Sequence, residues 1–279
     1  MNIRLHKVPV HLMPRKRKHD LLSERRSGME FNEKDIIVRR ANKTVYKVGN
    51  EVIKVSAPEH PKTGVFNEAL ITSYIESFGV PAAKVLYVKE FDGCWGLGLE
   101  YIEGQTLAEK MKEEPENLEA YLEKFIDVQL EVNSFRAIGL RNTIPKRTEE
   151  INALDIDPSI KWELLQRLAG MKRHTKLCHG DFVPDNVILT PDGGYKVIDW
   201  AHATSGNAGA DAALTYLQFS LDHQDFADKY LRLYSRKSNT AIQYIQKWMP
   251  IVAAGQLHKA KSEEEKALLE KWISVAEYQ

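Results

Sequence analysis

The sequence predicts an α+β fold with two lobes, a small antiparallel sheet with one helix followed by a larger, mainly helical lobe. Two observations support this prediction. Residues 31–102 contain short β-rich runs separated by turn residues, with a single helical pattern between them. After Gly104, apolar residues recur every three or four positions over most of the chain. We therefore expect a first lobe at 29–102 and a second at 103–279, preceded by a tail at 1–28.

Strands are expected at the start of the first lobe. Ile36-Ile37-Val38 is a short apolar run, and two further β-rich runs occupy 45–48 and 52–55. Gly49-Asn50 separates these two runs, and turn residues of this kind between β-rich runs are a hairpin signal. The sequence therefore predicts an antiparallel pair here.

One helix and two more strands complete the predicted first lobe. Apolar residues in 67–78 recur at helical spacing, and Gly79 and Pro81 would end that helix. Strands are predicted at 83–88 and 95–102, joined around Asp92-Gly93.

The second lobe should be helical around one small hairpin. Apolar residues spaced by three or four predict a helix face over 118–135, and a second helix is expected at 158–171. The apolar runs 187–189 and 195–198 flank a Pro-Asp-Gly-Gly turn, which predicts a hairpin. From Asp211 onward the pattern is helical again.

Composition excludes several function classes. Lys+Arg and Asp+Glu each number 39, so the zero net charge gives no overall attraction to nucleic acid or membrane. No apolar run approaches the ~20 residues that a membrane helix needs. Cys94 and Cys178 are far apart and match neither a redox nor a zinc spacing. We expect reduced thiols in a cytoplasmic protein with no membrane partner.

Residues 1–28 differ from the rest of the chain because they are strongly basic, with Arg-Lys-Arg-Lys at 15–18. Such a run is typical of a disordered tail, since termini are often disordered unless tied down. It could also be a patch for nucleic acid or an acidic partner. We expect the disordered tail and no nucleic-acid partner.

One segment has the spacing of a phosphoryl-transfer site. Residues 178–189 read Cys-His-Gly-Asp-Phe-Val-Pro-Asp-Asn-Val-Ile-Leu, and Asp199 follows after one hairpin. An Asp, then an Asn five positions later, then a second Asp at the end of a hairpin is the spacing of a kinase catalytic loop. Each residue alone would be an ordinary turn or cap residue. Their joint spacing is the specific signal.

The residue types suit this chemistry. Phosphoryl transfer needs a carboxylate to orient and deprotonate the acceptor hydroxyl, which predicts Asp181 as the base. It also needs oxygen ligands for Mg²⁺, which prefers hard oxygen donors. Asn186 and Asp199 are the predicted metal ligands, and ATP is the predicted co-substrate.

A second pair of residues fits the nucleotide end of such a site. Lys54 lies in the strand run 52–55 and Glu68 lies in the predicted helix. A strand lysine paired with a helix glutamate positions the α- and β-phosphates in kinases. By themselves the two could be surface residues, but the downstream motif favours the pairing.

With these residues in view, the chain resembles the aminoglycoside phosphotransferase/choline kinase-like family of small-molecule kinases from about Phe31 to the C-terminus. The resemblance implies a protein kinase-like fold and a hydroxyl of a small molecule as phosphate acceptor. It implies that Glu100-Tyr101-Ile102 is the hinge that meets adenine, through Glu100 and Ile102. It also implies that His179 supports the catalytic loop and that Asp211 has a structural role.

The chain departs from the family pattern in two places. Val183 stands where the family often has His, and the phosphate loop 40–44 contains no Gly. Phosphate contacts in that loop would come from Lys43, from Thr44 or from backbone N–H groups. The family's acceptors are diverse, so the resemblance does not name this one. Candidates for an acidic or aromatic acceptor wall are Asp155, Asp157, Trp162, Glu163, Tyr216, Asp222 and Trp248.

Two other functions compete with a small-molecule kinase. A regulated protein kinase would have Arg before the catalytic Asp and an Ala-Pro-Glu downstream, whereas this chain has Gly180 and no such motif. A catalytically silent nucleotide-binding module of the same fold would be expected to lack one of Lys54, Asp181, Asn186 or Asp199. All four are present.

Overall fold

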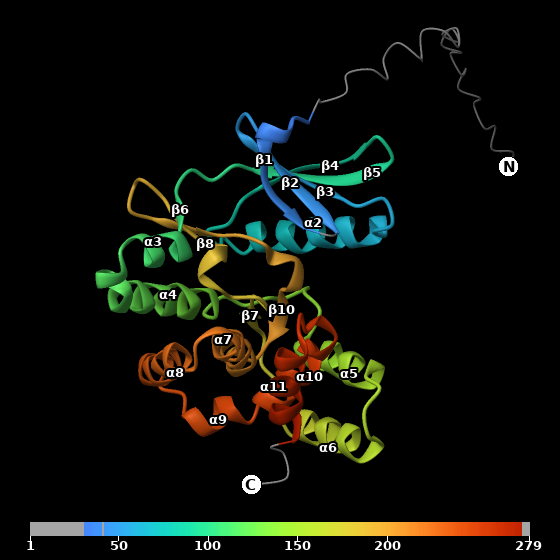
Figure 1. Ribbon diagram of the computed structural model, residues 1–279, viewed down its shortest axis with the longest axis vertical. Helices are drawn as coiled ribbons and strands as arrows, with labels where there is room; N and C mark the ends of the chain where they lie inside the picture. The colour runs from blue at the N-terminus through green and yellow to red at the C-terminus, as the bar shows by residue number, and fades with distance from the viewer. Residues whose placement is uncertain (1–30, 41, 275–279) are drawn as a thin grey trace, which may run out of the picture.

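An antiparallel sheet in the order β1-β2-β3-β5-β4 builds the first lobe of the protein. The computed structural model describes residues 31–40 and 42–274 (Figure 1), so the expectation for the tail at 1–28 lies outside the described residues. The strands are β1 (Ile36–Arg40), β2 (Lys43–Val48), β3 (Glu51–Ser56), β4 (Val85–Phe91) and β5 (Cys94–Glu100). Each predicted strand of this lobe is present, with shifts of a few residues at its ends.

The two predicted turns set the register of this sheet. Val48 pairs with Glu51 across Gly49-Asn50, and Gly49 has φ +60°. Phe91 pairs with Cys94 across Asp92-Gly93, whose φ values of 46° and 83° are those of a tight hairpin turn. Register matters here because a shift of one residue would exchange the two faces of a strand.

Helix α2 (Lys62–Ser77) covers the inner face of the sheet (Figure 1). Val65 and Ala69 of α2 pack against Leu97 and Leu99 of β5 in a small apolar core. The helix begins five residues before the predicted start at Asn67, because the Lys-Thr-Gly segment that opens it has no apolar periodicity to reveal it.

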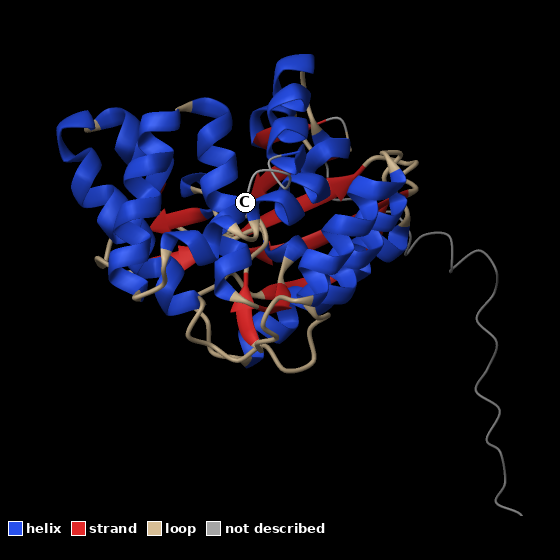
Figure 2. Cartoon of the chain, turned by 90° about the horizontal axis from the view of Figure 1, so that it is seen from below, coloured by secondary structure: helices blue, strands red, loops and turns tan. Residues whose placement is uncertain are grey.

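The second lobe is mainly helical (Figure 2), and its helices surround a large apolar core. Its helices are α3 (Leu107–Glu113), α4 (Leu118–Val132), α5 (Thr143–Ala153), α6 (Pro158–Ala169), α7 (Ala208–Asp222), α8 (Gln224–Ser238), α9 (Ile242–Gln246), α10 (Met249–Gln256) and α11 (Glu263–Ser274). Helices α4 and α6 end two or three residues before their predicted ends. Helix α5 was not predicted, because its Thr-Ile-Pro-Lys-Arg-Thr-Glu-Glu segment is mostly polar.

Short strands between the lobes hold the segments that matter for function. The predicted hairpin is β8 (Val187–Leu189) with β9 (Tyr195–Val197), and β6 (Gln105–Thr106) pairs with β8. Strand β7 (Lys176–Cys178) pairs with β10 (Thr204–Gly206). The catalytic-loop sequence therefore runs from the end of β7 to the start of β8, facing the first lobe.

The fold tests two of the expectations from the sequence. The predicted α+β architecture, with a sheet lobe and a helical lobe, is confirmed. Cys94 and Cys178 are both free thiols. Within the described ranges, no helix has the length and apolar character needed to cross a membrane.

Candidate active site

The loop between β7 and β8 carries His179, Gly180 and Asp181. Gly180 has φ +79°, and a Cβ there would come within 2.5 Å of the carbonyl oxygen of His202. Glycine is therefore required by both the backbone conformation and the close approach. The loop continues into a 3-10 turn, η3 (Pro184–Asn186), which delivers Asn186.

Asp211, in the first turn of α7, holds this loop from below. Its carboxylate accepts hydrogen bonds from the backbone N–H of His179 (3.1 Å) and of Gly180 (2.8 Å), and from the side-chain amide of Asn133 (3.2 Å). The Asp211 side chain is buried. These donors offset the cost of burying its charge and fix the backbone that precedes Asp181.

The His179 ring is fully buried and serves the loop structurally. Its Nδ1 accepts from the backbone N–H of Asp181 (3.2 Å), so its Nε2 must donate to the carbonyl of Ile198 (3.0 Å) in the neutral ring. The ring thereby ties the residue before Asp199 to Asp181.

Asp181 is held by a residue that the sequence did not single out. Gln218 of α7 donates from Nε2 to Oδ1 of Asp181 at 2.5 Å. The amide nitrogen must face this carboxylate, because an ionised carboxylate only accepts hydrogen bonds. A signal for Gln218 was available, since it follows Asp211 by seven positions and therefore lies on the same face of one helix.

The side-chain oxygen of Asn186 makes no hydrogen bond within the loop. Its Nδ2 donates to the carbonyl of Asp181 (2.9 Å), and its own backbone carbonyl accepts from Ile198 N–H (2.9 Å). The side chain is buried. With the nitrogen used inside the loop, the oxygen is the atom left to bind a ligand.

Asp199 lies at the end of the β8–β9 hairpin in a left-handed backbone conformation, with φ 63° and ψ 56°. This conformation is uncommon for a residue other than glycine and is concentrated at functional sites. Trp200, the next residue, is buried and anchors the turn by donating from its indole to the carbonyl of Val197 (2.8 Å).

Lys54 joins the two lobes at this point. Its Nζ lies 2.7 Å from Glu68 Oε1 on α2 and 2.8 Å from Asp199 Oδ1. Lys43 Nζ lies 3.6 Å from the same Asp199 oxygen. The predicted pairing of a strand lysine with a helix glutamate is thus present as a contact, and the ammonium also reaches the hairpin aspartate.

The pKa values in this group follow from burial and charge. For Asp199, burial alone would raise the pKa, but the ammonium groups of Lys54 and Lys43 hold the pKa below its usual value. For Lys54, burial alone would lower the pKa, but Glu68 and Asp199 raise the pKa above its usual value. The lysine is therefore a cation and Asp199 an anion at neutral pH.

A cavity of about 530 Å³ leads from this charged group to the segment that joins the lobes. Lys54, Glu68, Asn186 and Asp199 line one end. Glu100, Tyr101 and Ile102 line the other end, between apolar side chains that include Val45, Val52, Ala83, Leu99, Ile188 and Ile198. In the described chain, the N–H of Tyr101 donates to Asn50, whereas the N–H of Ile102 has no protein partner.

The structure does not bring Thr44 to this cavity. Alternate residues of β2, namely Lys43, Val45 and Lys47, line it, and Thr44 lies on the opposite face of the sheet. Successive side chains in a strand point to opposite faces, which directs the Thr44 side chain away from this cavity. Lys43, the alternative in the same loop, is the residue that faces the site.

The candidates for an acidic or aromatic acceptor wall are not assembled around a cleft. None of the seven residues lines the two large cavities between the lobes. Tyr216 and Trp248 belong to the buried core, and Asp157 caps α6 by accepting from Ser159 N–H (2.7 Å). Trp162 is exposed on α6. Sequence position alone could not show which helix faces turn toward the catalytic loop.

Solved structures share this fold. Aminoglycoside phosphotransferase APH(4)-Ia is similar with a TM-score of 0.63 and 15% identity, over 92% of this chain and 96% of that chain. The aminoglycoside-3'-phosphotransferase of type VIII has a TM-score of 0.58 and 15% identity, over 79% and 93%. APH(3'')-Id from Streptomyces rimosus, in complex with ADP and streptomycin, has a TM-score of 0.56 and 17% identity, over 78% and 94%. At these identities the likeness shows the fold.

Sequence comparison identifies the family. No curated protein matches this sequence closely enough to count as a relative. The model of the phosphotransferase enzyme family, however, matches residues 37–248, a range that runs from β1 to the start of α10 and includes both lobes of the site. The chain belongs to the phosphotransferase enzyme family.

Proposed function

We propose that this protein is a kinase that moves the γ-phosphoryl group of Mg·ATP to a hydroxyl of a small molecule. In this reaction Asp181 accepts the proton of the acceptor hydroxyl as the acceptor oxygen bonds to the γ-phosphorus. The bond from that phosphorus to the β–γ bridging oxygen breaks, and ADP leaves. Asp181 suits this role because Gln218 engages one carboxylate oxygen (2.5 Å) and leaves the other for the acceptor.

The observation that most supports the proposal is the position of Lys54 between Glu68 and Asp199, at 2.7 and 2.8 Å. This contact closes the two lobes over a common point and delivers a cation where β- and γ-phosphates would bind. Phosphoryl transfer depends mainly on positioning and charge stabilisation, and such preorganised charges supply both. Lys43, 3.6 Å from Asp199, adds a second cation there.

The residues present fit a magnesium ion. Asn186 has its amide nitrogen occupied by the Asp181 carbonyl, which leaves its oxygen available, and Asp199 is held ionised by its lysine neighbours. Mg²⁺ is usually bound by one or two protein oxygen ligands together with substrate phosphates. When bound, Mg²⁺ would offset the charge of the phosphates.

The other end of the cavity suits adenine. Its apolar walls would enclose the ring, and the unpartnered N–H of Ile102 would donate to the ring edge, with the carbonyl of Glu100 as the acceptor.

We also propose the division of the chain into two lobes at 102/103. The sheet ends at Glu100, and β6, which begins at Gln105, already pairs with β8 of the second lobe.

The test is ADP release from Mg·ATP with a panel of hydroxyl-bearing acceptors, with Asp181→Asn as the control. We expect acceptor-dependent turnover that is lost in Asp181→Asn, while binding of Mg·AMP-PNP is kept. Turnover at the wild-type rate in Asp181→Asn would refute the assignment of the base. Nucleotide binding with no turnover on any acceptor would instead support a catalytically silent nucleotide-binding module.

A further inference from the structure

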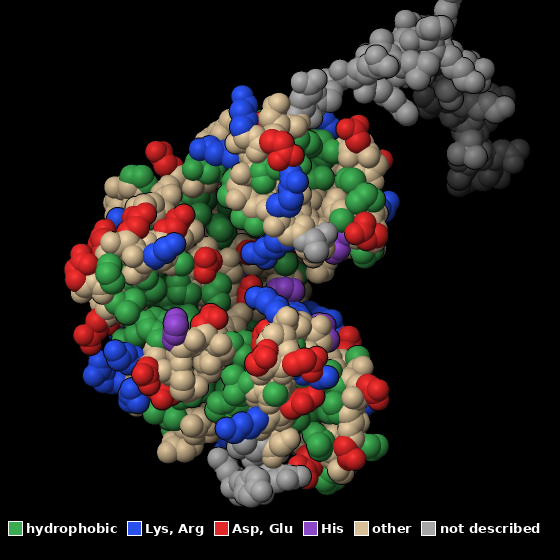
Figure 3. Space-filling view, viewed as in Figure 1, with side chains coloured by type: hydrophobic (Ala, Val, Ile, Leu, Met, Phe, Trp, Pro, Cys, Tyr) green, Lys and Arg blue, Asp and Glu red, His purple; other side chains and the backbone are tan. Residues whose placement is uncertain are grey.

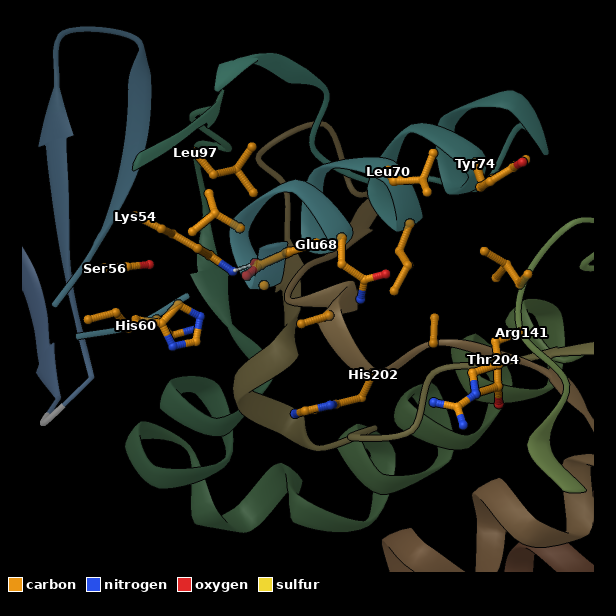
Figure 4. A pocket seen from close by; sticks show the side chains of 18 of the residues that line it. Lys54, Ser56, His60, Glu68, Leu70, Tyr74, Leu97, Arg141, His202 and Thr204 are labelled. Carbon is orange, nitrogen blue, oxygen red and sulfur yellow. Dashed lines mark hydrogen bonds and ion pairs between the residues drawn. The ribbon is translucent and has the colours of Figure 1, made fainter. Parts of the chain in front are cut away.

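A second cavity, of about 710 Å³, adjoins the nucleotide cavity on the other side of Lys54 and Glu68. It lies between α2 of the first lobe and two segments of the second lobe, 139–146 and 201–204. Figure 4 shows His60, His202 and Arg141 around the space beneath α2, with the Lys54–Glu68 pair at its edge. The hollow between the lobes in Figure 3 has Lys, Arg and His side chains along it.

The charges around this cavity are unbalanced. Lys43, Lys54, Arg141 and Lys146 line it, together with the imidazoles of two histidines. Among the described residues that line it, Glu68 is the single carboxylate, and it is already paired with Lys54 at 2.7 Å. The lining therefore has more cations than carboxylates, although Lys43 and Arg141 have carboxylate partners, Asp199 and Glu149, outside it.

Lys146, on α5, is the lysine of this group that has no carboxylate partner. Its neighbours are paired, Arg147 with Glu150 at 2.6 Å and Arg141 with Glu149. Within the part of the chain that the structure describes, Nζ of Lys146 makes no ion pair and donates to the carbonyl oxygen of His202 at 3.0 Å. An ammonium group has three donors, so two remain for a ligand.

This contact places Lys146 beside the catalytic loop. The carbonyl of His202 that accepts from Lys146 is the atom that packs against Gly180, the residue before Asp181. Thr143, Lys146, Gly180 and His202 also line one small gap together. The charge of Asp181 acts on the ring of His202, as that of Asp199 does. An acceptor that occupies this cavity would therefore lie beside the loop that carries Asp181, although Asp181 itself is not part of the cavity wall.

The electrostatics of the wall support a site for an anion. Burial and the neighbouring cations Arg147, Lys259 and Arg141 lower the pKa of Lys146 to about 8, although Glu150 acts in the opposite direction. Burial of the ring, together with the charges of Lys259 and Lys146, lowers the pKa of His202 to about 4. At neutral pH, Lys146 is thus a cation near three other cations and the carboxylate of Glu150, and His202 is a neutral hydrogen-bonding group. A bound anion would relieve the repulsion.

We propose that the acceptor molecule carries an anionic oxygen group, a carboxylate or a phosphate, which Lys146 binds beside Asp181. This inference rests on the proposed function, because it names the acceptor class of the same site. A cationic acceptor would meet Lys43, Arg141 and Lys146 with no free carboxylate opposite it on the described wall. The anionic group gains charge-assisted hydrogen bonds from Lys146, and the neutral His202 ring can add another.

The first experiment compares acceptors that share a hydroxyl and differ in charge. Two matched sets are glycerate, glycerol and 3-amino-1,2-propanediol, and gluconate, glucose and glucosamine, with hygromycin B as a larger cationic acceptor. Initial rates of ADP release are measured with Mg·ATP at pH 7. We expect kcat/KM for the anionic member to exceed that of its neutral and cationic counterparts by about tenfold or more. Equal or better turnover of a neutral or cationic member would overturn the proposal.

The second experiment measures anion binding without turnover. Inorganic sulfate is titrated by calorimetry against the protein saturated with Mg·AMP-PNP, so that the phosphate end of the site is occupied. The variant is Lys146→Met, which keeps much of the side-chain volume. Its matched control is Lys161→Met, because Lys161 also donates to a backbone carbonyl, that of Asn152 at 3.3 Å, but lies outside the cavity.

We expect Lys146→Met to weaken sulfate binding roughly tenfold to a hundredfold, as for loss of a hydrogen bond to a charged group. Lys161→Met should leave it unchanged, and Lys146→Arg should restore most of it. Equal binding in wild type and Lys146→Met, or no binding to wild type at 50 mM sulfate, would overturn the proposal.

The two experiments separate failure of this inference from failure of the proposed function. Turnover that needs Asp181 but prefers a neutral or cationic acceptor would keep the kinase and reject the anionic acceptor. Sulfate binding that needs Lys146, with no acceptor-dependent turnover in either set, would keep the anion site and count against phosphotransfer to these hydroxyl compounds.

Discussion

Gln218 donates its side-chain amide to the carboxylate of Asp181 at 2.5 Å, from a helix whose first turn also holds the loop that contains Asp181. The other amide atom, Oε1 of Gln218, is buried and has no protein partner in the described chain. One helix therefore fixes both the backbone before Asp181, through Asp211, and the direction of its carboxylate. Gln218 is a positioning residue for the proposed base.

Replacing Gln218 by Leu should lower kcat about tenfold and leave KM for Mg·ATP nearly unchanged, because an unrestrained carboxylate spends less time aligned with the acceptor hydroxyl. Steady-state kinetics with varied Mg·ATP measures kcat and KM separately and so checks this prediction. Gln166→Leu, on the exposed surface of α6, is the control. A rise in KM for ATP with kcat unchanged would show that Gln218 does not act through Asp181.

Loss of the Lys54 ammonium should impair the use of Mg·ATP rather than the alignment of Asp181. We expect Lys54→Met to reduce kcat/KM for Mg·ATP by about a hundredfold or more, because it removes a preorganised cation, leaves Glu68 without its partner and leaves Asp199 with only the more distant Lys43. Glu68→Gln should reduce kcat/KM for Mg·ATP by less, since the amide oxygen can still accept a hydrogen bond from Lys54. Lys89→Met, exposed on β4, is the control. Unchanged ATP kinetics in Lys54→Met would contradict the assigned phosphate contact.

Local patterns in the sequence were enough to predict the sheet lobe and the hairpin before Asp199. The predicted turns at Gly49-Asn50 and Asp92-Gly93 are present, with positive φ values at Gly49, Asp92 and Gly93, and apolar spacing predicts the helices that bury one face. The contact of Lys54 with Glu68 was also predicted, because a strand lysine paired with a helix glutamate accompanies the catalytic-loop spacing in kinases.

Features that depend on tertiary packing were not predictable in the same way. The face of β2 on which Thr44 lies was not predictable, because side chains alternate with a period of two and the exact register was unknown. The second cavity combines α2 with 139–146 and 201–204, and its key lysine lies on α5, a polar helix with little apolar periodicity. No single segment of the sequence contains the excess positive charge found there.

Asp211 should contribute to the stability of the fold as well as to the position of the loop that carries Asp181. Asp211→Ala leaves the buried N–H groups of His179 and Gly180 without their acceptor, and it also removes a partner of Asn133. We expect the free energy of unfolding to fall by about 2–4 kcal/mol, measured by urea denaturation. Asp222→Ala, exposed at the other end of α7, should change it by less than about 0.5 kcal/mol. A similar small change in Asp211→Ala would mean that water replaces the carboxylate.

The pH dependence of acceptor use should report Lys146. Its ammonium form binds the proposed anion and its neutral form does not, so kcat/KM for an anionic acceptor should be level below about pH 8 and fall as pH rises through that pKa. The charged groups that set this pKa are Arg147, Glu150, Lys259 and Arg141. Lys146→Arg should remove this fall, because a guanidinium stays charged through this range. The same fall in Lys146→Arg would assign the titration to another group, and a level profile in the wild type would exclude Lys146 from acceptor binding.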